Sequence, residues 1–191
     1  MSCQEWLIAD INYTEQNTID LLLKYSVHSF TINGENVYFS IYSRYDYAFG
    51  LNNRYDESIR GVVGVLLPTY FSSDVQNILT SIYSTDKAAI PSYEQMGFGF
   101  GSTTPYAIFS PACNLTWSSD GNYLSGTNNK LIMNDAYGQP FSFMCRDLVS
   151  QDSAYYYHGY ITTDYGRFQT SETYQQPCVM HWRPVIRIKT K

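Results

Sequence analysis

The segment 153–168, SAYYYHGYITTDYGRF, gathers five tyrosines, one histidine and one aspartate in sixteen residues. In an extended strand alternate residues lie on opposite faces, so Tyr156, His158 and Tyr160 would share one face. Tyrosine and histidine combine an apolar body with a polar tip, which can stack on a sugar ring and hydrogen-bond its hydroxyls. The pattern predicts either a row that binds carbohydrate or protein, or a strand packed on one face in the core and on the other in a subunit interface.

The segment 116–123, TWSSDGNY, is a second candidate contact site, because aromatic and polar residues surround a turn there. Its candidate ligand-binding residues are Trp117, Asp120, Asn122 and Tyr123. These residue types suit a recognition loop and equally suit ordinary packing.

Catalytic chemistry is not marked in the sequence. His158 could act as a base beside Asp152 or Asp164, with one of many serines as nucleophile, but the chain has no GxSxG elbow. The 17 acidic residues are scattered and form no distinctive pair for glycoside hydrolysis. We therefore expect a non-enzymatic protein, and a hydrolase with an unmarked active site is the third hypothesis.

Metal and cofactor sites are not expected either. Cys178 and His181, with Cys145 and His158, have the residue types of a zinc site, but residues i and i+3 of a strand point to opposite faces. The segment 97–102, GFGFGS, has the glycines of a phosphate loop without the GxGxxG pattern or a following helix. We expect no metal and no cofactor.

The four cysteines, Cys3, Cys113, Cys145 and Cys178, are widely spaced and include no CxxC pair. The start of the chain lacks the basic leader and apolar core of a signal peptide, so we expect synthesis in a reducing cytosol and buried thiols. The alternative is a structural pair of Cys145 and Cys178, if their expected strands are neighbours. No apolar run approaches the roughly 20 residues of a membrane span, and no membrane insertion is expected.

The composition disfavours nucleic acid and favours self-association. Charged residues make up 15% of the chain, aromatic residues 17%, and tyrosine alone numbers 19. The net charge of −5 opposes binding to a phosphate backbone, and the low ionic content predicts a homo-oligomer. The acidic residues of segment 1–20 and the basic residues of segment 183–191 predict attraction between the two ends, within or between subunits.

Apolar spacing predicts the elements of the first half. The segment 17–25, NTIDLLLKY, has a helical pattern and predicts a short helix capped at Asn17 or the next residue. The segment 59–71, IRGVVGVLLPTYF, predicts a buried strand that ends near its proline. The segment 72–84, SSDVQNILTSIYS, predicts a second short helix capped at Ser72 or the next residue.

Strand patterns dominate the rest of the chain. Segments 28–32 and 37–45 flank an Asn-Gly dipeptide and predict a hairpin. From about residue 90, short β-type runs are divided by turn residues in the manner of a sandwich or barrel. We predict a mainly β fold with two short helices (α+β), whose C-terminal half is an antiparallel β-sandwich or barrel-like. One domain over 1–191 is expected, with a subdomain boundary near 90–102 as the alternative.

The ending 179–189, VMHWRPVIRIK, resembles the closing strand of C-type-lectin-like domains in bacterial and phage variable proteins. Trp182, Arg183, Pro184, Val185 and Ile186 carry the resemblance, while the glycine and tryptophan motifs that precede this ending in the family are missing. It implies a lectin-like carbohydrate-binding module.

The composition as a whole resembles tail-fibre, baseplate and decoration proteins of tailed phages, because it is low in charge and rich in Tyr, Asn, Ser and Thr. That resemblance implies a virion structural subunit, made in the host cytoplasm without a signal peptide. Its expected partners are further copies of itself, other virion subunits and a cell-surface glycan. We take this as the leading hypothesis and the lectin-like module as the alternative.

Overall fold

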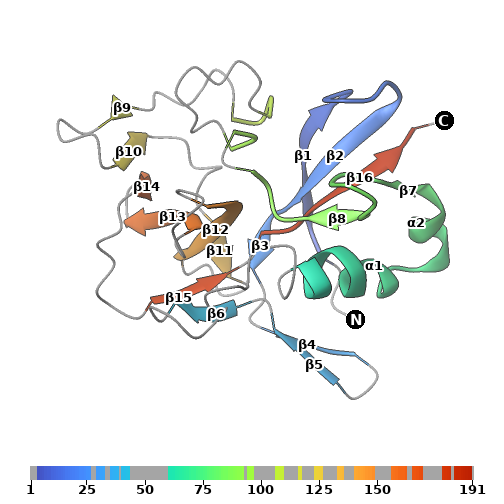
Figure 1. The fold of residues 1–191 in the computed structure, drawn as a ribbon, viewed down its shortest axis with the longest axis horizontal. Coiled ribbons are helices and arrows are strands. Elements are labelled where there is room, and N and C mark those ends of the chain that lie inside the picture. Colours follow the sequence, from blue (N-terminus) through green and yellow to red (C-terminus); the bar gives the residue numbers. More distant parts are fainter. Residues whose placement is uncertain are drawn as a thin grey trace.

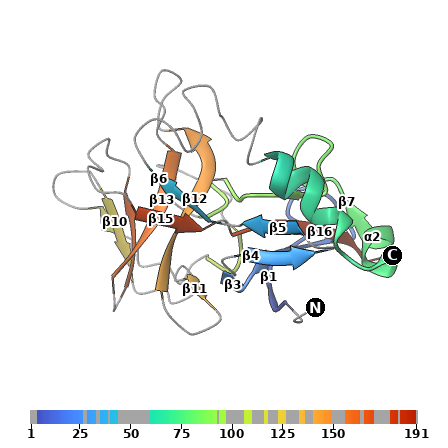
Figure 2. The same ribbon diagram turned by 90° about the horizontal axis from the view of Figure 1, so that it is seen from below.

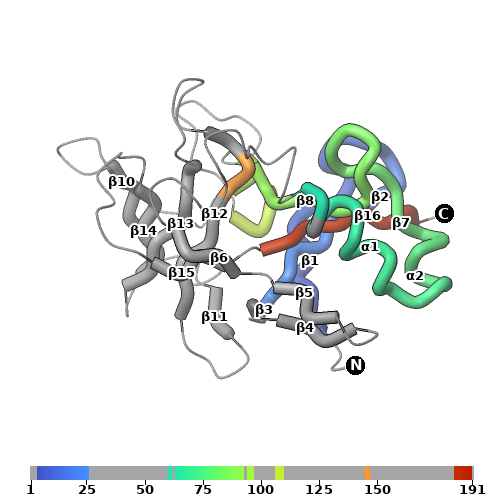
Figure 3. Tube along the Cα trace, turned by 60° about the horizontal axis from the view of Figure 1, so that its bottom comes forward, coloured from blue at the N-terminus to red at the C-terminus, as the bar shows by residue number. Residues whose placement is uncertain are grey.

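Two large β-sheets lie side by side in a computed structural model of the chain, and a hairpin forms a third, two-stranded sheet (Figure 1). The structure describes residues 4–26, 29–32, 35–38, 40–43, 60–92, 94–96, 106–109, 116–117, 123–126, 133–135, 140–148, 156–162, 165–169, 178–181 and 183–190. It describes side chains at 4–25, 60–61, 63–92, 94–96, 106–109, 145–146 and 183–190. Most of these side chains belong to the half that holds β1, β2, β16 and the helices (Figure 3).

The first sheet joins the start of the chain to its end. Its strands are β1 (Trp6–Ile11), β2 (Thr18–Leu23), β16 (Val185–Lys189) and β7 (Leu79–Thr80), in the order β1-β2-β16-β7, and β8 (Ala88–Ala89) also pairs with β16. Every pairing is antiparallel. We call it the five-stranded sheet.

The helix predicted over 17–25 is wrong, because Thr18–Leu23 forms strand β2. Apolar residues in that segment fit a helical spacing, but pairing with β1 on one side and β16 on the other overrides this weak local preference. Asn17 is a turn residue rather than a helix cap, with φ of 62°. The side chain of Asn12 accepts hydrogen bonds from the backbone N–H groups of Asn17 and Thr18, at 2.8 and 3.3 Å, and so fixes the β1–β2 turn.

The buried strand predicted over 59–71 is also wrong, because this segment is helical. It contains the π-helix η1 (Gly61–Leu66) and α1 (Leu67–Thr69). Val63 and Leu67 are buried whereas Val65 is exposed, as expected when residues four apart share one face of a helix. Pro68 is tolerated because it lies in the first turn of α1.

The predicted second helix is confirmed at its start and is shorter than expected. It forms α2 (Ser73–Ile78), and the Ser72 hydroxyl accepts a hydrogen bond from the backbone N–H of Val75 at 3.5 Å. At Leu79 the backbone becomes extended and pairs with β16 as strand β7, which ends the helix. The helical segment lies beside β7, β8 and β16 (Figure 1).

The second sheet has nine strands, and we call it the nine-stranded sheet. Its main path runs β3-β11-β12-β13-β14-β10-β9, and β15 pairs with both β12 and β6. The bounds are β3 (Tyr25–Ser26), β6 (Ser40–Ser43), β9 (Thr116–Trp117), β10 (Tyr123–Gly126), β11 (Met133–Asp135), β12 (Pro140–Leu148), β13 (Tyr156–Thr162), β14 (Tyr165–Gln169) and β15 (Cys178–His181). The pairs β3–β11 and β12–β15 are parallel and the others are antiparallel.

The predicted hairpin forms, but the strand expected over 37–45 is divided: only its start pairs within the hairpin, and β6 pairs with β15 instead. Strands β4 (Ser29–Ile32) and β5 (Glu35–Tyr38) pair antiparallel, and Ile32 faces Glu35 across the two-residue Asn-Gly connection. With the two sheets and few short helices, the chain is mainly β, as predicted (Figure 2).

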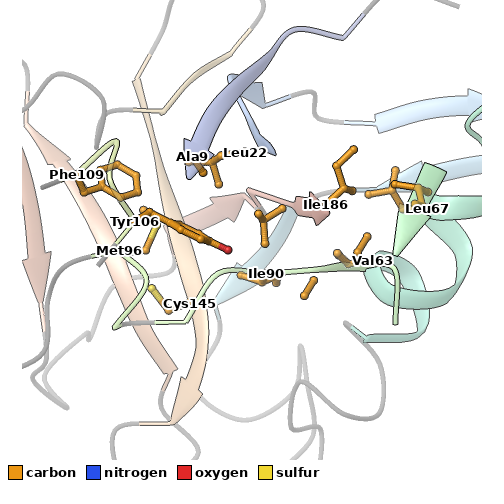
Figure 4. Close-up of a cluster of buried hydrophobic side chains, with 14 residues drawn as sticks. Ala9, Leu22, Val63, Leu67, Ile90, Met96, Tyr106, Phe109, Cys145 and Ile186 are labelled. Carbon is orange, nitrogen blue, oxygen red and sulfur yellow. The ribbon is translucent and has the colours of Figure 1, made fainter. Parts of the chain in front are cut away.

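The core lies between the helical segment, the five-stranded sheet and the edge of β12 (Figure 4). One cluster of buried hydrophobic residues includes Leu22 and Ile186 from the sheet, Val63 and Leu67 from the helices, and Cys145 from β12. The cluster therefore extends from one sheet to the other. The subdomain boundary near 90–102 stays a prediction.

Strand β1 is the edge of the five-stranded sheet, and its outer side is partly covered. The pairing of β1 with β2 has an irregularity between Ile8 and Asp10, as a β-bulge produces. At this point the backbone N–H of Ile108 donates to the Ala9 carbonyl at 3.0 Å, and the N–H of Ala107 donates to the Asp10 carboxylate at 2.7 Å. The turn 106–109 thus occupies the middle of the β1 edge.

Candidate functional site

The tyrosine–histidine row lies on β13, an inner strand of the nine-stranded sheet. Tyr156, His158 and Tyr160 occupy alternate positions of β13, which pairs with β12 on one side and β14 on the other. Alternate positions of a strand share one face, so the backbone agrees with the spacing expected from the sequence. The side chains of these residues lie outside those that the structure describes.

Register across the sheet brings further residues into line with this row. Tyr123 of β10 faces Gln169 of β14, and Gln169 faces His158 of β13. One row further on, Ser125 faces Arg167, and Arg167 faces Tyr160. Directly opposite residues of antiparallel strands share a face. These positions, together with Thr116 opposite Ser125, form what we call the polar rows: Tyr123–Gln169–His158 and Thr116–Ser125–Arg167–Tyr160. On β12 the first of these rows continues to the apolar Met144, which faces His158.

The strand register places the residues of the second candidate site, segment 116–123, on different faces of the sheet. Tyr123 belongs to a polar row, whereas Trp117 faces Leu124 and therefore falls on the opposite face of the sheet. That opposite row runs Trp117–Leu124–Phe168–Gly159–Phe143 and continues to His181 of β15 and Ser40 of β6, so it combines apolar and polar residue types. Asp120 and Asn122 lie outside the described residues.

The two cysteines proposed as a pair are on neighbouring strands but out of register. β12 and β15 run parallel with Ser142 opposite Met180, so Cys178 lies level with Pro140, five residues before Cys145. At a rise of about 3.3 Å per residue this spacing is about 16 Å, well beyond the roughly 7 Å limit between Cα atoms in a disulfide. The register therefore does not favour the Cys145–Cys178 pair. Cys145 itself is buried in the hydrophobic cluster.

A buried ion pair joins the two ends of the chain. Arg187 of β16 faces Asp20 of β2, and its Nε and Nη2 donate to the two carboxylate oxygens at 2.6 and 2.8 Å. Both residues are buried. Burial lowers the pKa of Arg187, but the hydrogen bond and charge of Asp20 outweigh that effect and the pKa is raised overall. The attraction expected between the acidic start and the basic end thus occurs within one subunit.

Tyr106 lies beside this ion pair and was not singled out by the sequence. Its side chain is 0% exposed, and within the described part of the chain its hydroxyl makes no hydrogen bond. Burial raises the pKa of Tyr106 well above its usual value, and the negative charge of Asp20 adds to the rise. The ring packs at a tilt against Tyr13, with 4.7 Å between centroids. Nothing in a chain with 19 tyrosines marks this one as buried.

Arg183, part of the motif near the end of the chain, is buried at the entry to β16. Its Nε donates to the Leu23 carbonyl at 3.1 Å, and its guanidinium carbon lies 6.0 Å from the centre of the Phe109 ring. Burial lowers the pKa of Arg183 to about 9. The backbone N–H of Leu23 also bonds the Pro184 carbonyl at 2.9 Å, so this motif anchors the end of β2.

A third polar cluster ties β12 to segment 90–96. Arg146 Nη1 donates to the Ile90 carbonyl at 3.0 Å and to Gln95 Oε1 at 2.9 Å, and its guanidinium lies 4.8 Å from the centre of the Tyr83 ring. Ser92 and Gln95 exchange side-chain-to-backbone hydrogen bonds at 2.7 and 3.0 Å, in the pattern of a capping box. These polar groups stabilise the segment by hydrogen-bonding with one another and with its backbone.

Asp86 forms a further ion pair with Arg60, which begins the helical segment. Arg60 Nη2 donates to Asp86 Oδ1 at 3.1 Å, and Arg60 Nε donates to Asp86 Oδ2. Asp86 packs so closely over η1 that a Cβ atom at Gly64 would lie 2.6 Å from its Oδ2. An alanine at this position would force the Asp86 carboxylate to move.

The polar side chains that the structure describes include two ion pairs with buried carboxylates, Arg187–Asp20 and Arg60–Asp86. In this part of the chain, no three histidine, cysteine, aspartate or glutamate residues are arranged to hold a metal ion. Where the structure describes helices, none is both long enough and apolar enough to cross a membrane.

The apolar face of the five-stranded sheet is covered along only part of its width. Two rows cross it: Ile8–Leu21–Ile186–Ala88 and Ile11–Ile19–Ile188–Leu79. Leu79 and Ile186, which lie toward the helices, are 5% and 2% exposed, whereas Ile8 and Ile11 at the β1 edge are 58% and 59% exposed. Trp6, on the same face, packs near Phe71 with 6.0 Å between ring centroids. We call Ile8, Ile11 and Ile19 the open end of the apolar face.

Comparisons with models of protein families, with curated proteins and with solved structures find no match to this chain.

Proposed function

We propose that this chain is a non-enzymatic structural subunit of a phage virion, of the tail, fibre or decoration type, that assembles with copies of itself and contributes to host-surface recognition. Within this proposal the C-terminal half forms an antiparallel β-sandwich or barrel-like unit. The protein is made in the host cytoplasm and becomes part of the virion, where it contacts other virion subunits.

The observation that carries the assembly part is the open end of the apolar face. Ile8 and Ile11 are more than half exposed, whereas the neighbouring Ile19 on the same sheet face is partly buried. Contiguous exposed apolar residues of this kind mark surfaces that bury themselves against another protein. The low content of charged residues, 15%, further reduces the solubility of a bare monomer.

The test is the mass of the protein in solution, measured by light scattering over a range of concentrations. The parent protein should exceed its chain mass of 22.0 kDa, and the double variant Ile8→Thr, Ile11→Thr should shift toward that mass. Val65→Thr is the matched control, because Val65 is 60% exposed but lies on η1, away from the open end. A parent protein that stays at 22.0 kDa at high concentration would contradict the proposal.

The second candidate is a lectin-like carbohydrate-binding module that acts outside a virion, and the polar rows favour it. They bring Tyr123, His158 and Tyr160 to one face of one sheet, although these residues come from two separate segments. Aromatic and amide residues on one face suit the stacking and hydrogen bonding of a sugar. A free lectin would bind glycans as a monomer, whereas a virion subunit should bind its own copies or a partner subunit.

A further inference from the structure

The hydroxyl group of Tyr106 is a polar group inside the hydrophobic core. The side chain is 0% exposed, and within the described part of the chain its hydroxyl makes no hydrogen bond. The hydroxyl oxygen points into the cluster of buried side chains (Figure 4). A buried hydroxyl is unfavourable unless it is hydrogen-bonded, and an ordered water molecule supplies the partner where the protein does not.

The carboxylate of Asp20 lies close to this hydroxyl and has acceptor positions that its ion pair does not fill. Burial raises the pKa of Tyr106, and the negative charge of Asp20 raises it further, which places the two groups near each other. Among the described residues, Arg187 donates one hydrogen bond to each carboxylate oxygen, at 2.6 and 2.8 Å. Because a carboxylate has about four acceptor positions, about two are left for further donors.

The guanidinium of Arg187 adds a donor to the same buried place. Its Nε and Nη2 donate to Asp20, whereas Nη1 reaches the Ser81 carbonyl only at 3.5 Å. The arginine side chain is 6% exposed and the aspartate side chain 0%. An internal water molecule makes about three hydrogen bonds, and a hydroxyl, a carboxylate and a guanidinium together supply them.

From this arrangement we propose that one water molecule is bound inside the protein between Tyr106, Asp20 and Arg187. The water accepts a hydrogen bond from the tyrosine hydroxyl, donates one to the carboxylate and accepts one from the guanidinium. Because the arginine repels a cation and the aspartate repels an anion, the site selects a small neutral molecule. This water site is independent of the proposed function, since it lies in the core of one subunit.

The water would fasten the turn 106–109 to the ion pair behind it. The turn is already held at its outer side, where the backbone N–H of Ile108 donates to the Ala9 carbonyl at 3.0 Å. The water adds a link from the same turn to β2 and β16, through Asp20 and Arg187. Hydrogen exchange of the Ile108 amide therefore reports on this link, although a change at Tyr106 leaves the Ala9 carbonyl itself intact.

The main experiment counts long-lived internal water molecules by magnetic relaxation dispersion of the solvent nuclei. Tyr106→Phe should hold one fewer of them than the parent protein, because phenylalanine offers the water no donor. Tyr70→Phe is the matched control, since Tyr70 is only partly buried against the same cluster, and it should hold as many as the parent. A crystal structure of the parent should place this water within hydrogen-bond distance of Tyr106 Oη and the Asp20 carboxylate.

A second measurement follows hydrogen exchange of the Ile108 amide. Exchange should be about fivefold faster in Tyr106→Phe than in the parent, the factor that one net hydrogen bond supplies, and unchanged in Tyr70→Phe. If Tyr106→Phe does not fold, the crystal structure of the parent decides. The inference is overturned if the parent and Tyr106→Phe hold equal numbers of internal waters, or if the crystal structure shows the Tyr106 hydroxyl bonded directly to Asp20.

Discussion

In the five-stranded sheet, charged residues lie inside and isoleucines reach the surface, whereas in the nine-stranded sheet the register places polar and apolar residues in the same rows, since His158 faces both Gln169 and Met144. Asp20 and Arg187 can be buried because they face each other directly across β2 and β16. Arg167 of β14 instead faces Ser125 and Tyr160 in register. Alternation of polarity along a strand therefore does not by itself tell which face of a sheet is inside, because a charged residue can be buried where a residue of opposite charge faces it across the sheet.

Loss of the buried Asp20–Arg187 ion pair should destabilise the protein most. Asp20→Asn leaves Arg187 buried beside a neutral group and should lower the free energy of unfolding by about 3–5 kcal/mol, measured by urea denaturation. Glu5→Gln makes the same chemical change in the exposed Lys24–Glu5 pair and should have no measurable effect.

A second variant pair sharpens this test. Replacing both partners, with Asp20→Leu and Arg187→Met, should recover most of the lost stability, because neither charge is then left alone in the interior. If Asp20→Asn is as stable as the parent, the pair does not hold the two ends together.

An intermediate loss of stability is expected at Gly64, where the buried Asp86 carboxylate packs on η1. Gly64→Ala would place a Cβ atom 2.6 Å from Asp86 Oδ2 and should cost about 1–3 kcal/mol in unfolding free energy through overpacking. Gly61→Ala is the matched control in the same helix, because nothing lies within 4 Å of its added Cβ. That variant should be neutral or more stable by up to about 1 kcal/mol. Equal melting temperatures for the two variants would show that Asp86 moves freely.

At neutral pH, loss of the buried Tyr106 hydroxyl should change the stability least. Tyr106→Phe removes a buried group that makes no hydrogen bond among the described residues, so the unfolding free energy should stay within about 1 kcal/mol of the parent. At high pH the two proteins should separate. Because the folded pKa of Tyr106 is raised above its usual 10.0, the unfolded chain loses this proton first, and stability is lost as pH rises above about 10.

Tyr106→Phe should not lose this part of its stability. Denaturation at pH 7 and above pH 10 therefore measures the difference, and parallel pH profiles for the two proteins would contradict the burial of this hydroxyl.

Features set by local sequence were predictable, and features set by distant partners were not. The hairpin around Asn33 and the cap at Ser72 depend on a few adjacent residues, and both are confirmed. Segment 17–25 has a helical pattern but becomes a strand, because its neighbours β1 and β16 come from residues 6–11 and 185–189. For segment 59–71 the prediction was a strand and the structure has a helix. A short apolar run fits a buried strand and a buried helix equally well.

In the candidate site, too, features of a single strand were predictable and features that depend on strand register were not. Alternation along a single strand is enough to predict that Tyr156, His158 and Tyr160 share one face, and β13 has that alternation. Sequence could not show that Tyr123 joins them while Trp117 does not, because that depends on the registers of β9, β10 and β14. The attraction between the two ends was expected from charge, but only pairing of β2 with β16 selects Asp20 and Arg187 as partners.

The bulge in β1 and the turn 106–109 limit how copies of this chain can join. An uncovered edge strand accepts another strand without end and leads to open-ended fibrils. Here the Ile108 amide and the Asp10 carboxylate occupy the middle of that edge, so the sheet cannot be extended there by simple strand addition. Association through the isoleucines beside it would be face to face, and such contacts close once both faces are used. For the proposed association of copies we therefore expect assemblies of finite size rather than fibrils.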